Sequence, residues 1–247
     1  MSLGILVSGA SGTIGQSLIE EVGADSRFAI LGTATSERFF EPDLNADAII
    51  DFSHPRLLER TLDYALRHRL PLVTGTTGLP GLLDERLQEA ARSIAICQAA
   101  NFSIGLNLML RLAAESARAL GDDFDIEVLE MHHRRKIDSP SGTALALARS
   151  LACARGLVTH EALVHDRSRH RIPRSRGELG VGVLRGGDVA GEHTVYFLGE
   201  GERLELTHRA TDRRIFARGA LLAALRLQDQ SPGLVEFSDL VLGQTAK

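Results

Sequence analysis

The sequence predicts a doubly wound α/β fold with a parallel sheet, followed by a second α+β domain with a mixed or antiparallel sheet. Over the first hundred residues, short apolar runs alternate with segments of helical length. After Asn101-Phe102-Ser103 the pattern changes to a long helical segment and then several strand-like runs. Alternating β and α segments indicate parallel strands joined by helices, and successive strands indicate antiparallel pairing. The chain therefore divides into two domains.

The first half supplies five strands and three helices. We predict strands at Ile5–Ser8, Phe28–Leu31, Ala48–Phe52, Leu72–Thr74 and Ile94–Gln98. We predict helices between them near Ile14–Val22, Arg56–Arg67 and Leu82–Ala91. Each strand and the helix after it form the repeating unit of a parallel sheet.

The second half begins with a helix, a strand and a second helix. We place these at Ile104–Leu120, at Ile126–Met131 and from about Gly142 to Ala154, and we expect a polar loop or extended segment at Thr159–Gly177. Three further strands, at Val181–Leu184, Thr194–Leu198 and Leu204–Thr207, are separated by glycine-rich turns and predict a meander. Because its exposed edges need a cover, we expect an oligomer. A last helix at Ile215–Leu227 is expected to return to the first domain.

Composition excludes several classes of protein. The 247 residues are 44% hydrophobic and 24% charged, which is typical of a folded globular chain. A net charge of −4 argues against non-specific nucleic-acid binding. We find neither a signal peptide nor a long apolar run, so we expect a cytoplasmic protein without a membrane partner. Cys97 and Cys153 lie in apolar stretches and are expected to be buried free thiols.

A glycine motif follows the first predicted strand. Gly9, Gly12 and Gly15 have the spacing Gly-x-x-Gly-x-x-Gly and lead into a helix. Glycine lets the backbone turn tightly and approach a pyrophosphate, whose charge then lies at the helix N-terminus. The motif predicts a Rossmann-like dinucleotide site, although a tight turn alone is the simpler interpretation.

The choice between NADH and NADPH stays open. After the second strand, Glu37 is suited to bind the ribose of NADH, whereas Ser36 and Arg38 are suited to hold the extra phosphate of NADPH. Gly75-Thr76-Thr77-Gly78 follows the fourth strand, at the edge where such sheets bind ligands. Its backbone is a further candidate for the cofactor, with a plain turn as the alternative.

A cationic segment lies between the predicted strand and helix of the second half. From His132 to Lys136, five consecutive side chains can carry positive charge. The following Ser-Pro-Ser-Gly-Thr offers a serine for the N-cap and a proline for the first turn of an anion-binding helix. A lysine or a histidine can also donate a proton. A solvated charged face is the alternative.

Two other kinds of chemistry receive less support. His132 and His133 suggest zinc, but adjacent residues on a strand point in different directions, and we find no Cys or carboxylate set with the spacing for tetrahedral coordination. We therefore expect no metal. Ser141, His133 and Asp138 suggest nucleophilic catalysis, but Ser141 lies in no nucleophile elbow.

Five segments resemble one enzyme family over nearly the whole chain. The most specific one, from Glu130 to Ala144, matches E-x-H-H-x-x-K-x-D-x-P-S-G-T-A; the others are Gly75–Gly78, Ala99–Ser103, Arg185–Thr194 and Gly201–His208. The pattern resembles that of the 4-hydroxy-tetrahydrodipicolinate (dihydrodipicolinate) reductases. The resemblance implies a dinucleotide-binding domain at residues 1–102 and 213–247 and a substrate-binding and oligomerisation domain at residues 103–212, in a homotetramer.

The resemblance also implies roles for individual residues. His132 and Lys136 are the catalytic proton-donor candidates, and the candidates for binding the two substrate carboxylates are His133, Lys136, Ser141, Gly142 and Thr143. The cofactor candidates are Gly9, Ala10, Ser11, Gly12, Thr13, Ile14, Gly75, Thr76, Thr77, Ala99, Ala100, Asn101 and Phe102, with Arg213 and Phe216 as lesser ones.

The implied reaction is the NAD(P)H-dependent reduction of 4-hydroxy-tetrahydrodipicolinate to tetrahydrodipicolinate with loss of water, in lysine and diaminopimelate biosynthesis. Its substrate is a cyclic imine with two carboxylates. The family commonly has Gly-Arg-Met-Gly where this chain has Gly12-Thr13-Ile14-Gly15, a departure that bears on cofactor choice. The alternatives are another NAD(P)-dependent dehydrogenase or epimerase of a small anionic substrate, or a non-catalytic nucleotide-binding protein.

Overall fold

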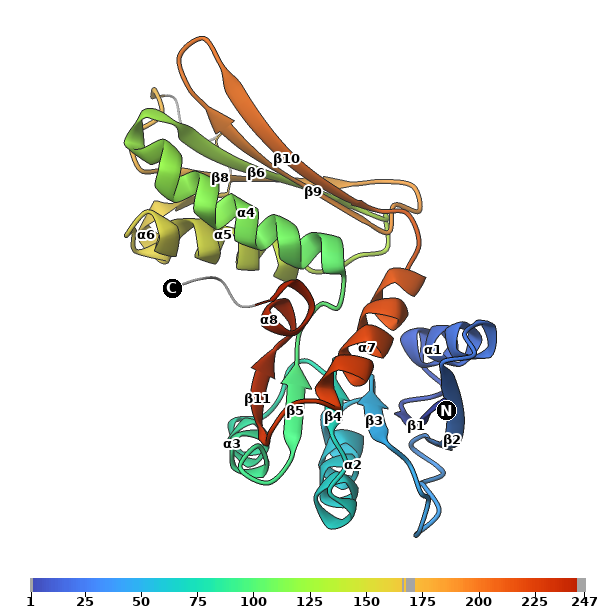
Figure 1. Ribbon diagram of the computed structural model, residues 1–247. Helices are drawn as coiled ribbons and strands as arrows, with labels where there is room; N and C mark the ends of the chain where they lie inside the picture. Colours follow the sequence, from blue (N-terminus) through green and yellow to red (C-terminus); the bar gives the residue numbers. More distant parts are fainter. Residues whose placement is uncertain (1, 166, 168–171, 244–247) are drawn as a thin grey trace. The chain divides into compact units, whose positions relative to one another are not determined.

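The computed structural model describes residues 2–165, 167 and 172–243 (Figure 1). The chain forms two compact units. Unit 1 contains Met1–Ile104 and Arg213–Lys247, and unit 2 contains Gly105–Asp212. The C-terminal segment thus belongs to the same unit as the N-terminus. No helix among the described residues is long and apolar enough to cross a membrane.

Unit 1 is a six-stranded parallel sheet with helices on both faces, which confirms the predicted doubly wound, Rossmann-like fold. Its elements are β1 (Leu3–Ser8), α1 (Thr13–Ala24), β2 (Phe28–Ala34), β3 (Ala48–Asp51), α2 (Pro55–His68), β4 (Leu72–Thr74), α3 (Gly81–Ala90), β5 (Ala95–Gln98), α7 (Arg214–Leu227), β11 (Gly233–Glu236) and α8 (Phe237–Leu242). The strand order is β11-β5-β4-β3-β1-β2. Since β1 lies between β2 and β3, the order reverses at β1, where doubly wound folds bind their ligands.

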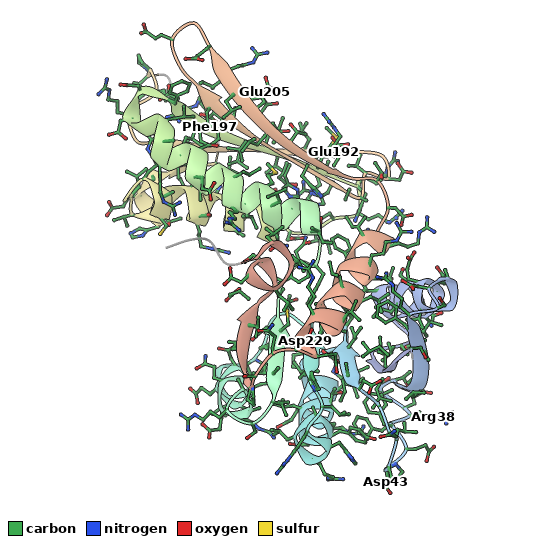
Figure 2. The ribbon with its side chains drawn as sticks, in the orientation of Figure 1. Arg38, Asp43, Glu192, Phe197, Glu205 and Asp229 are labelled. Atoms are coloured by element: carbon green, nitrogen blue, oxygen red, sulfur yellow. The ribbon has the colours of Figure 1, made fainter. Side chains whose placement is uncertain are left out.

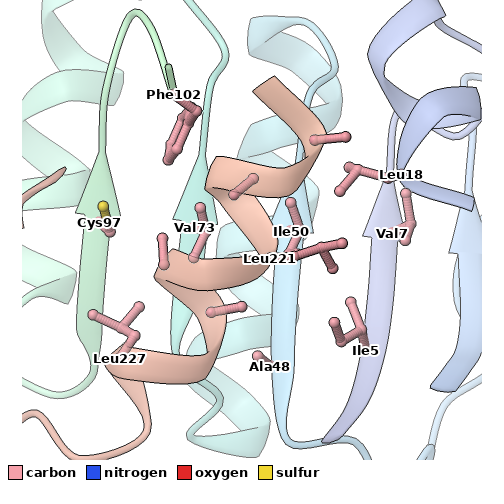
Figure 3. Packing of buried hydrophobic residues seen from close by; sticks show 14 of the residues in the cluster. Ile5, Val7, Leu18, Ala48, Ile50, Val73, Cys97, Phe102, Leu221 and Leu227 are labelled. Carbon is pink, nitrogen blue, oxygen red and sulfur yellow. The ribbon is translucent and has the colours of Figure 1, made fainter. Parts of the chain in front are cut away.

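The apolar residues of the central strands alternate between two cores. Ile5 and Val7 on β1 face the helices α1, α7 and α8, whereas Leu6 faces α2 and α3. The same alternation on β3 sends Ile50 to the first core and Ile49 to the second. Figure 3 shows α7 packed over the first core, with its apolar side chains meeting those of the strands. Both faces are thus buried, as parallel sheets require.

The sixth strand was not expected from the sequence. β11 pairs with β5 in parallel, with Gly233 opposite Ala95, and leads directly into α8. Its four residues alternate between half-buried and exposed side chains, as suits an edge strand. The helix α7 agrees closely with the predicted Ile215–Leu227.

Unit 2 is a five-stranded mixed sheet with helices packed on one face. Its elements are α4 (Ile104–Leu120), a 3-10 turn (Gly121–Asp123), β6 (Asp125–His132), α5 (Gly142–Ala154), α6 (Thr159–Ala162), β7 (Leu163–Val164), β8 (Leu179–Arg185), β9 (Gly191–Leu198) and β10 (Arg203–Ala210). The first residue of α4, Ile104, is the last residue of unit 1 before the boundary. The strand order is β10-β9-β6-β8-β7. Buried residues of α4 and α5 form one core with β6, β8 and β9.

Three expectations were wrong in part, two about the strands and loops of unit 2 and one about the cysteines. The three late strands are not a simple meander, because β6 lies between β8 and β9 and pairs with both of them. Thr159–Gly177 contains the helix α6 and the short strand β7, with Ala162 buried in the core, while residues 166 and 168–171 lie outside the described part. Cys97 is buried as expected, but Cys153 is exposed, because it lies on the outer side of α5.

Two glycines in helices provide a matched test of the packing of unit 1. A Cβ at Gly219 of α7 would lie 1.8 Å from the carbonyl oxygen of Phe102, whereas a Cβ at Gly23 of α1 would meet no atom within 4 Å. We expect Gly219→Ala to lower the free energy of unfolding by about 1–3 kcal/mol. Gly23→Ala should leave it unchanged or raise it by up to about 1 kcal/mol, through helix propensity. Urea denaturation of both variants measures the difference; a stabilised G219A would contradict the described packing.

Candidate functional site

The glycine turn of unit 1 follows β1 at the carboxyl edge of the sheet. A Cβ at Gly9 would lie 2.2 Å from the carbonyl oxygen of Phe52, and one at Gly15 would lie 2.2 Å from that of Gly9. These positions therefore require glycine because backbone meets backbone. Gly12 is the N-cap of α1, is exposed, and has no side chain to occupy the first N–H groups of the helix. Those N–H groups suit the pyrophosphate of a dinucleotide.

The end of β2 forms a tight exposed turn beside the glycine turn. The Thr35 hydroxyl accepts hydrogen bonds from the backbone N–H of Glu37 and of Arg38, at 3.3 and 3.2 Å. The side chains of Ser36, Glu37 and Arg38 are consequently exposed. Arg38 lies 3.6 Å from Glu41 in an ion pair that is open to solvent on both sides. Figure 2 shows Arg38 projecting from this part of unit 1.

The second predicted cofactor loop depends on a buried carboxylate that the sequence analysis did not identify. Asp51, at the end of β3, is fully buried and accepts hydrogen bonds from the hydroxyls of Ser53, Thr74 and Thr76. The Thr76 side chain therefore points into the protein. Of the two threonines in this loop, only Thr77 has a solvent-exposed side chain. A Cβ at Gly75 would overlap the ring of Phe52, at 2.2 Å.

The third cofactor segment presents mainly its backbone. Phe102 is 1% exposed, and its ring packs edge-on against Phe52 and Phe237. Ala10 is likewise buried, at 5% exposure. Ala100 is exposed, Ala99 and Asn101 are half-buried, and the side-chain oxygen of Asn101 accepts from the N–H of Ser103. Ala10, Thr76 and Phe102 can thus meet a cofactor only through backbone atoms.

In unit 2, strand register gathers four polar side chains on the face of the sheet that carries α4 and α5. On β6, Glu130 and His132 are two residues apart and share a face. Glu130 is paired with His193 of β9, and His132 with Arg185 of β8. Glu130, His132 and His193 are buried at 0%, 8% and 4% exposure. The sequence pointed to His132 but not to Glu130, Arg185 or His193; the alternation along β6 was the available signal for Glu130.

Glu130 is the centre of this group. Arg185 donates to both of its carboxylate oxygens, at 2.9 and 3.0 Å, and the backbone N–H of Ser141 donates to Oε1 at 3.1 Å. The Nδ1 atom of His132 contacts Oε2. Burial by itself would raise the pKa of Glu130, but the hydrogen bonds from Arg185, His132 and Ser141 outweigh burial and lower the pKa. The carboxyl group is therefore ionised in spite of its burial.

The two buried histidines respond to the same surroundings. Burial lowers the pKa of His132, and Lys136 and Arg185 lower it further, while the hydrogen bond and charge of Glu130 act in the opposite direction. Burial lowers the pKa of His193 to about 4, and the charge of His132 contributes. The rings lie edge to face, with centroids 5.2 Å apart.

The predicted anion-binding helix start is present, with one correction. The N-cap of α5 is Ser141, whose hydroxyl accepts from the N–H of Ala144 at 3.1 Å. Pro140 is not in the first turn as expected; it precedes the cap, after a cis peptide bond. Gly142 is exposed and Thr143 is half-buried at the start of the helix, which has no acidic residue in its first turn. An anion is therefore favoured here.

The cationic loop is held by the connection between β8 and β9. The N–H of His133 donates to Val189 at 2.8 Å, and that of Arg134 donates to Gly187 at 3.3 Å. Within the loop, the Lys136 ammonium pairs with Asp138 at 2.8 Å. Lys136 is half-buried, whereas Arg134 and Arg135 are exposed. Of these three side chains, Lys136 is thus the one that its burial and its ion pair orient.

Two of the alternatives drawn from the sequence can be examined. Ligand atoms of Glu130, His132 and His193 lie within 4.8 Å of one another, a different set from the His132 and His133 considered in the sequence. Arg185 nevertheless donates to both carboxylate oxygens, and a cation there would meet the guanidinium charge. This set therefore does not fit a resident metal ion. Ser141 is buried, and its hydroxyl accepts from the N–H of Ala144 and lies 3.3 Å from Nε2 of His193, so in this structure the hydroxyl serves as the cap of α5.

The buried His193 predicts a pH dependence of stability. Its pKa in the folded chain, about 4, is below the usual value of 6.5, so the unfolded chain binds the additional proton between these values. The contribution of His193 to the free energy of unfolding should therefore be fully present above about pH 6.5. It should decrease as the pH falls toward 4, by about 3 kcal/mol in total. We expect His193→Gln to lose less stability than the parent between pH 6.5 and 4.5 in urea unfolding. Parallel curves for the two proteins would contradict this role.

Comparisons with known proteins agree with these features. The family description "Dihydrodipicolinate reductase, N-terminus" matches residues 3–102, and "Dihydrodipicolinate reductase, C-terminus" matches residues 105–241. A 4-hydroxy-tetrahydrodipicolinate reductase from Akkermansia muciniphila is 43% identical, covering 97% of this chain and 98% of that protein. One from Pseudomonas fluorescens strain Pf-5 is 40% identical, covering 96% and 98%.

Solved structures show the same fold. A dipicolinate-bound dihydrodipicolinate reductase from Paenisporosarcina sp. TG-14 has a TM-score of 0.78 with 21% identity, covering 96% of this chain and 98% of that one. An engineered D-amino acid dehydrogenase bound to NADP+ has a TM-score of 0.54 with 14% identity, covering 97% and 94%. Since both halves match one family and full-length relatives share about 40% of their residues with it, the chain belongs to the dihydrodipicolinate reductase family.

Proposed function

We propose that this chain is an NAD(P)H-dependent oxidoreductase that reduces 4-hydroxy-tetrahydrodipicolinate to tetrahydrodipicolinate with loss of water, in lysine and diaminopimelate biosynthesis. The observation that carries the proposal is the arrangement in unit 2, where the oriented ammonium of Lys136 and the start of α5 accompany a buried histidine. Family membership supplies the reaction to which this arrangement is assigned.

The substrate is a dianionic ring, and the groups available in unit 2 suit its carboxylates. Lys136 offers a point charge, and the N–H groups of Gly142 and Thr143 lie at the positive end of α5. His133, on the loop between β6 and α5, is a further candidate. In this proposal a substrate carboxylate takes the place of Asp138 as the partner of the Lys136 ammonium.

The cofactor is assigned to the carboxyl edge of unit 1, where the glycine turn fits a pyrophosphate. When bound, the reduced nicotinamide supplies the hydride that is added to the ring. The chain's own task is then to bind the ring and to protonate the electron-rich product. His132, through Nε2, and Lys136, through Nζ, are the proposed donors.

Assembly and location complete the proposal. The face of the second sheet opposite α4 and α5 carries Leu129, Met131, Leu184 and Tyr196, and the edge strand β10 is exposed on the same sheet. We assign this surface to contacts within a homotetramer, whose mass light scattering can measure.

We place the protein in the cytoplasm, in line with two free cysteines.

A coupled assay tests the function directly. The substrate is generated enzymatically from pyruvate and aspartate semialdehyde, and NADH and NADPH oxidation are each followed by absorbance. Oxidation that depends on fresh substrate supports the proposal. Reduction of NAD(P)+ by hydroxy acids or amino acids, without that NAD(P)H oxidation, would favour another dehydrogenase. No change in either cofactor with any substrate would favour a non-catalytic nucleotide-binding protein.

The proposed contacts predict separate kinetic effects. Lys136→Ala should lower turnover by about 10²–10⁴-fold without weakening NAD(P)H binding, because it removes a proton donor from unit 2 only. Thr143→Ala keeps the backbone N–H but removes the half-buried hydroxyl beside it, and should therefore mainly raise KM. Arg149→Ala, an exposed cation on the same helix α5, is the matched control and should behave like the parent. Steady-state kinetics decide; unchanged turnover in K136A would remove Lys136 from the mechanism.

Cofactor choice can be tested at the turn after β2. If Arg38 holds the extra phosphate of NADPH, its removal costs a charged hydrogen bond of about 1.5–3 kcal/mol. Arg38→Ala should then raise KM for NADPH by roughly ten- to hundredfold and leave KM for NADH nearly unchanged. Arg92→Ala, which loses a comparable surface pair with Glu89, is the control. Equal changes for both cofactors would contradict this role of Arg38.

A further inference from the structure

Glu130 connects the parts of unit 2 that the proposed function uses. Its carboxylate contacts Nδ1 of His132 and accepts from the backbone N–H of Ser141, the residue that caps α5. Its partner Arg185 donates in addition to the carbonyl oxygen of Asp138 at 2.6 Å, in the loop that contains Lys136. One buried carboxylate and its counter-ion therefore hold the histidine, the helix start and the cationic loop together.

The contact with Nδ1 determines where His132 carries its protons. An ionised carboxylate can only accept, so the Nδ1 atom must donate and is the protonated nitrogen of the neutral ring. A second proton can then bind only at Nε2. A Cβ at residue 191 would lie 3.0 Å from Nε2, and this residue is glycine. The Nδ1 atom is thus held against the buried Glu130 carboxylate. Because residue 191 has no side chain, nothing from that residue covers Nε2.

We propose that Glu130 is a positioning residue that holds His132 with Nδ1 protonated, so that Nε2 is the atom that donates a proton, and that Arg185 keeps the carboxylate in place. The role in proton donation rests on the proposed function; the state of the His132 ring does not. Neither the family resemblance nor the comparisons assign these two residues a part in the reaction.

Arg185 explains how a fully buried carboxylate remains ionised. Its guanidinium forms a bidentate pair with Glu130, and this geometry is the strongest available between an arginine and a carboxylate. Glu130 makes no contact with solvent, so without this pair it would be driven toward its neutral form. A neutral carboxyl group could also donate a hydrogen bond to Nδ1, and the neutral His132 ring could then carry its proton on Nε2.

The charges around His132 decide the direction of the expected change. Glu130 on the same strand favours the imidazolium, whereas Lys136 in the following loop and Arg185 on β8 disfavour it. The ring of His193 on β9 packs against His132, and charges on these two rings oppose each other. If the charge of Glu130 is removed, the remaining charged neighbours of His132 all disfavour its protonated form. The pKa of His132 should then fall, and turnover that depends on its protonated form should decline at a lower pH.

The first experiment needs no activity. The ring nitrogens of His132 are assigned in ¹⁵N spectra of the parent by comparison with His132→Gln, and the neutral tautomer is determined from their shifts at pH 8. We expect the proton on Nδ1. A neutral ring protonated on Nε2 would overturn the proposal, whatever the substrate of the protein proves to be.

The second experiment separates positioning from a general structural effect. Glu130→Gln should lower kcat at least about tenfold, leave the affinity for NADPH unchanged, and move the alkaline decline of kcat to lower pH by roughly one unit or more. Glu130→Asp, which retains the charge, should keep the decline closer to its parental position. Glu115→Gln is the control: Glu115 lies on α4 of the same unit, is exposed and pairs with Arg111.

Each outcome decides the matter. Parental kcat and pH profile in E130Q would overturn the proposal, and so would a lower kcat with an unmoved pH profile, which indicates a structural role only. If E130Q does not fold, the double variant Glu130→Gln/Arg185→Met removes both charges and leaves no unpaired buried ion. That variant should show a shift in the same direction but a smaller one, because the loss of Arg185 also removes a charge that lowers the pKa of His132. A parent that fails to reduce the substrate at all would refute the proposed function, while the tautomer experiment would still decide the role of Glu130.

Discussion

The bidentate ion pair between Glu130 and Arg185 joins the parallel strands β6 and β8. The same two side chains contact the start of α5 and the loop that contains Lys136. Ionising a fully buried carboxylate is unfavourable unless it is paired and hydrogen-bonded, and here four donor atoms from two side chains and one backbone N–H group surround it. Because the same carboxylate contacts His132 and Ser141, any rearrangement of the pair would disturb the histidine and the cap of α5 together.

The two units use different physical means for the anions assigned to them. In unit 1, the glycine turn depends on the absence of side chains, since Gly9 and Gly15 are too close to neighbouring backbone for a Cβ. Backbone N–H groups then remain available to a phosphate. In unit 2, charged side chains are themselves oriented by a buried network. This difference explains why a glycine pattern alone indicates the first site, whereas Glu130, Arg185 and His193, which surround His132 in the second, were found only in the structure.

Local patterns predicted much of the fold. The helices Ile104–Leu120 and Gly142–Ala154 and the strand Leu72–Thr74 have the expected bounds, because apolar periodicity and turn residues act within short distances along the chain. Pairing between distant strands has no such local signal. The insertion of β6 between β8 and β9, and the short edge strand β11, therefore escaped prediction. For the same reason, Arg185 and His193 were not placed beside His132. Glu130 could have been, because residues two apart on a strand share a face of the sheet.

The account of the site rests on Lys136, the start of α5 and a fixed His132 acting on one dianionic ring. A crystal structure with NADPH and pyridine-2,6-dicarboxylate is the most direct test. We predict one ligand carboxylate at the Lys136 ammonium, the other at the N–H groups of Gly142 and Thr143, and Nδ1 of His132 still bonded to Glu130. A ligand bound away from Lys136 and α5, or a His132 ring turned away from Glu130, would contradict the account.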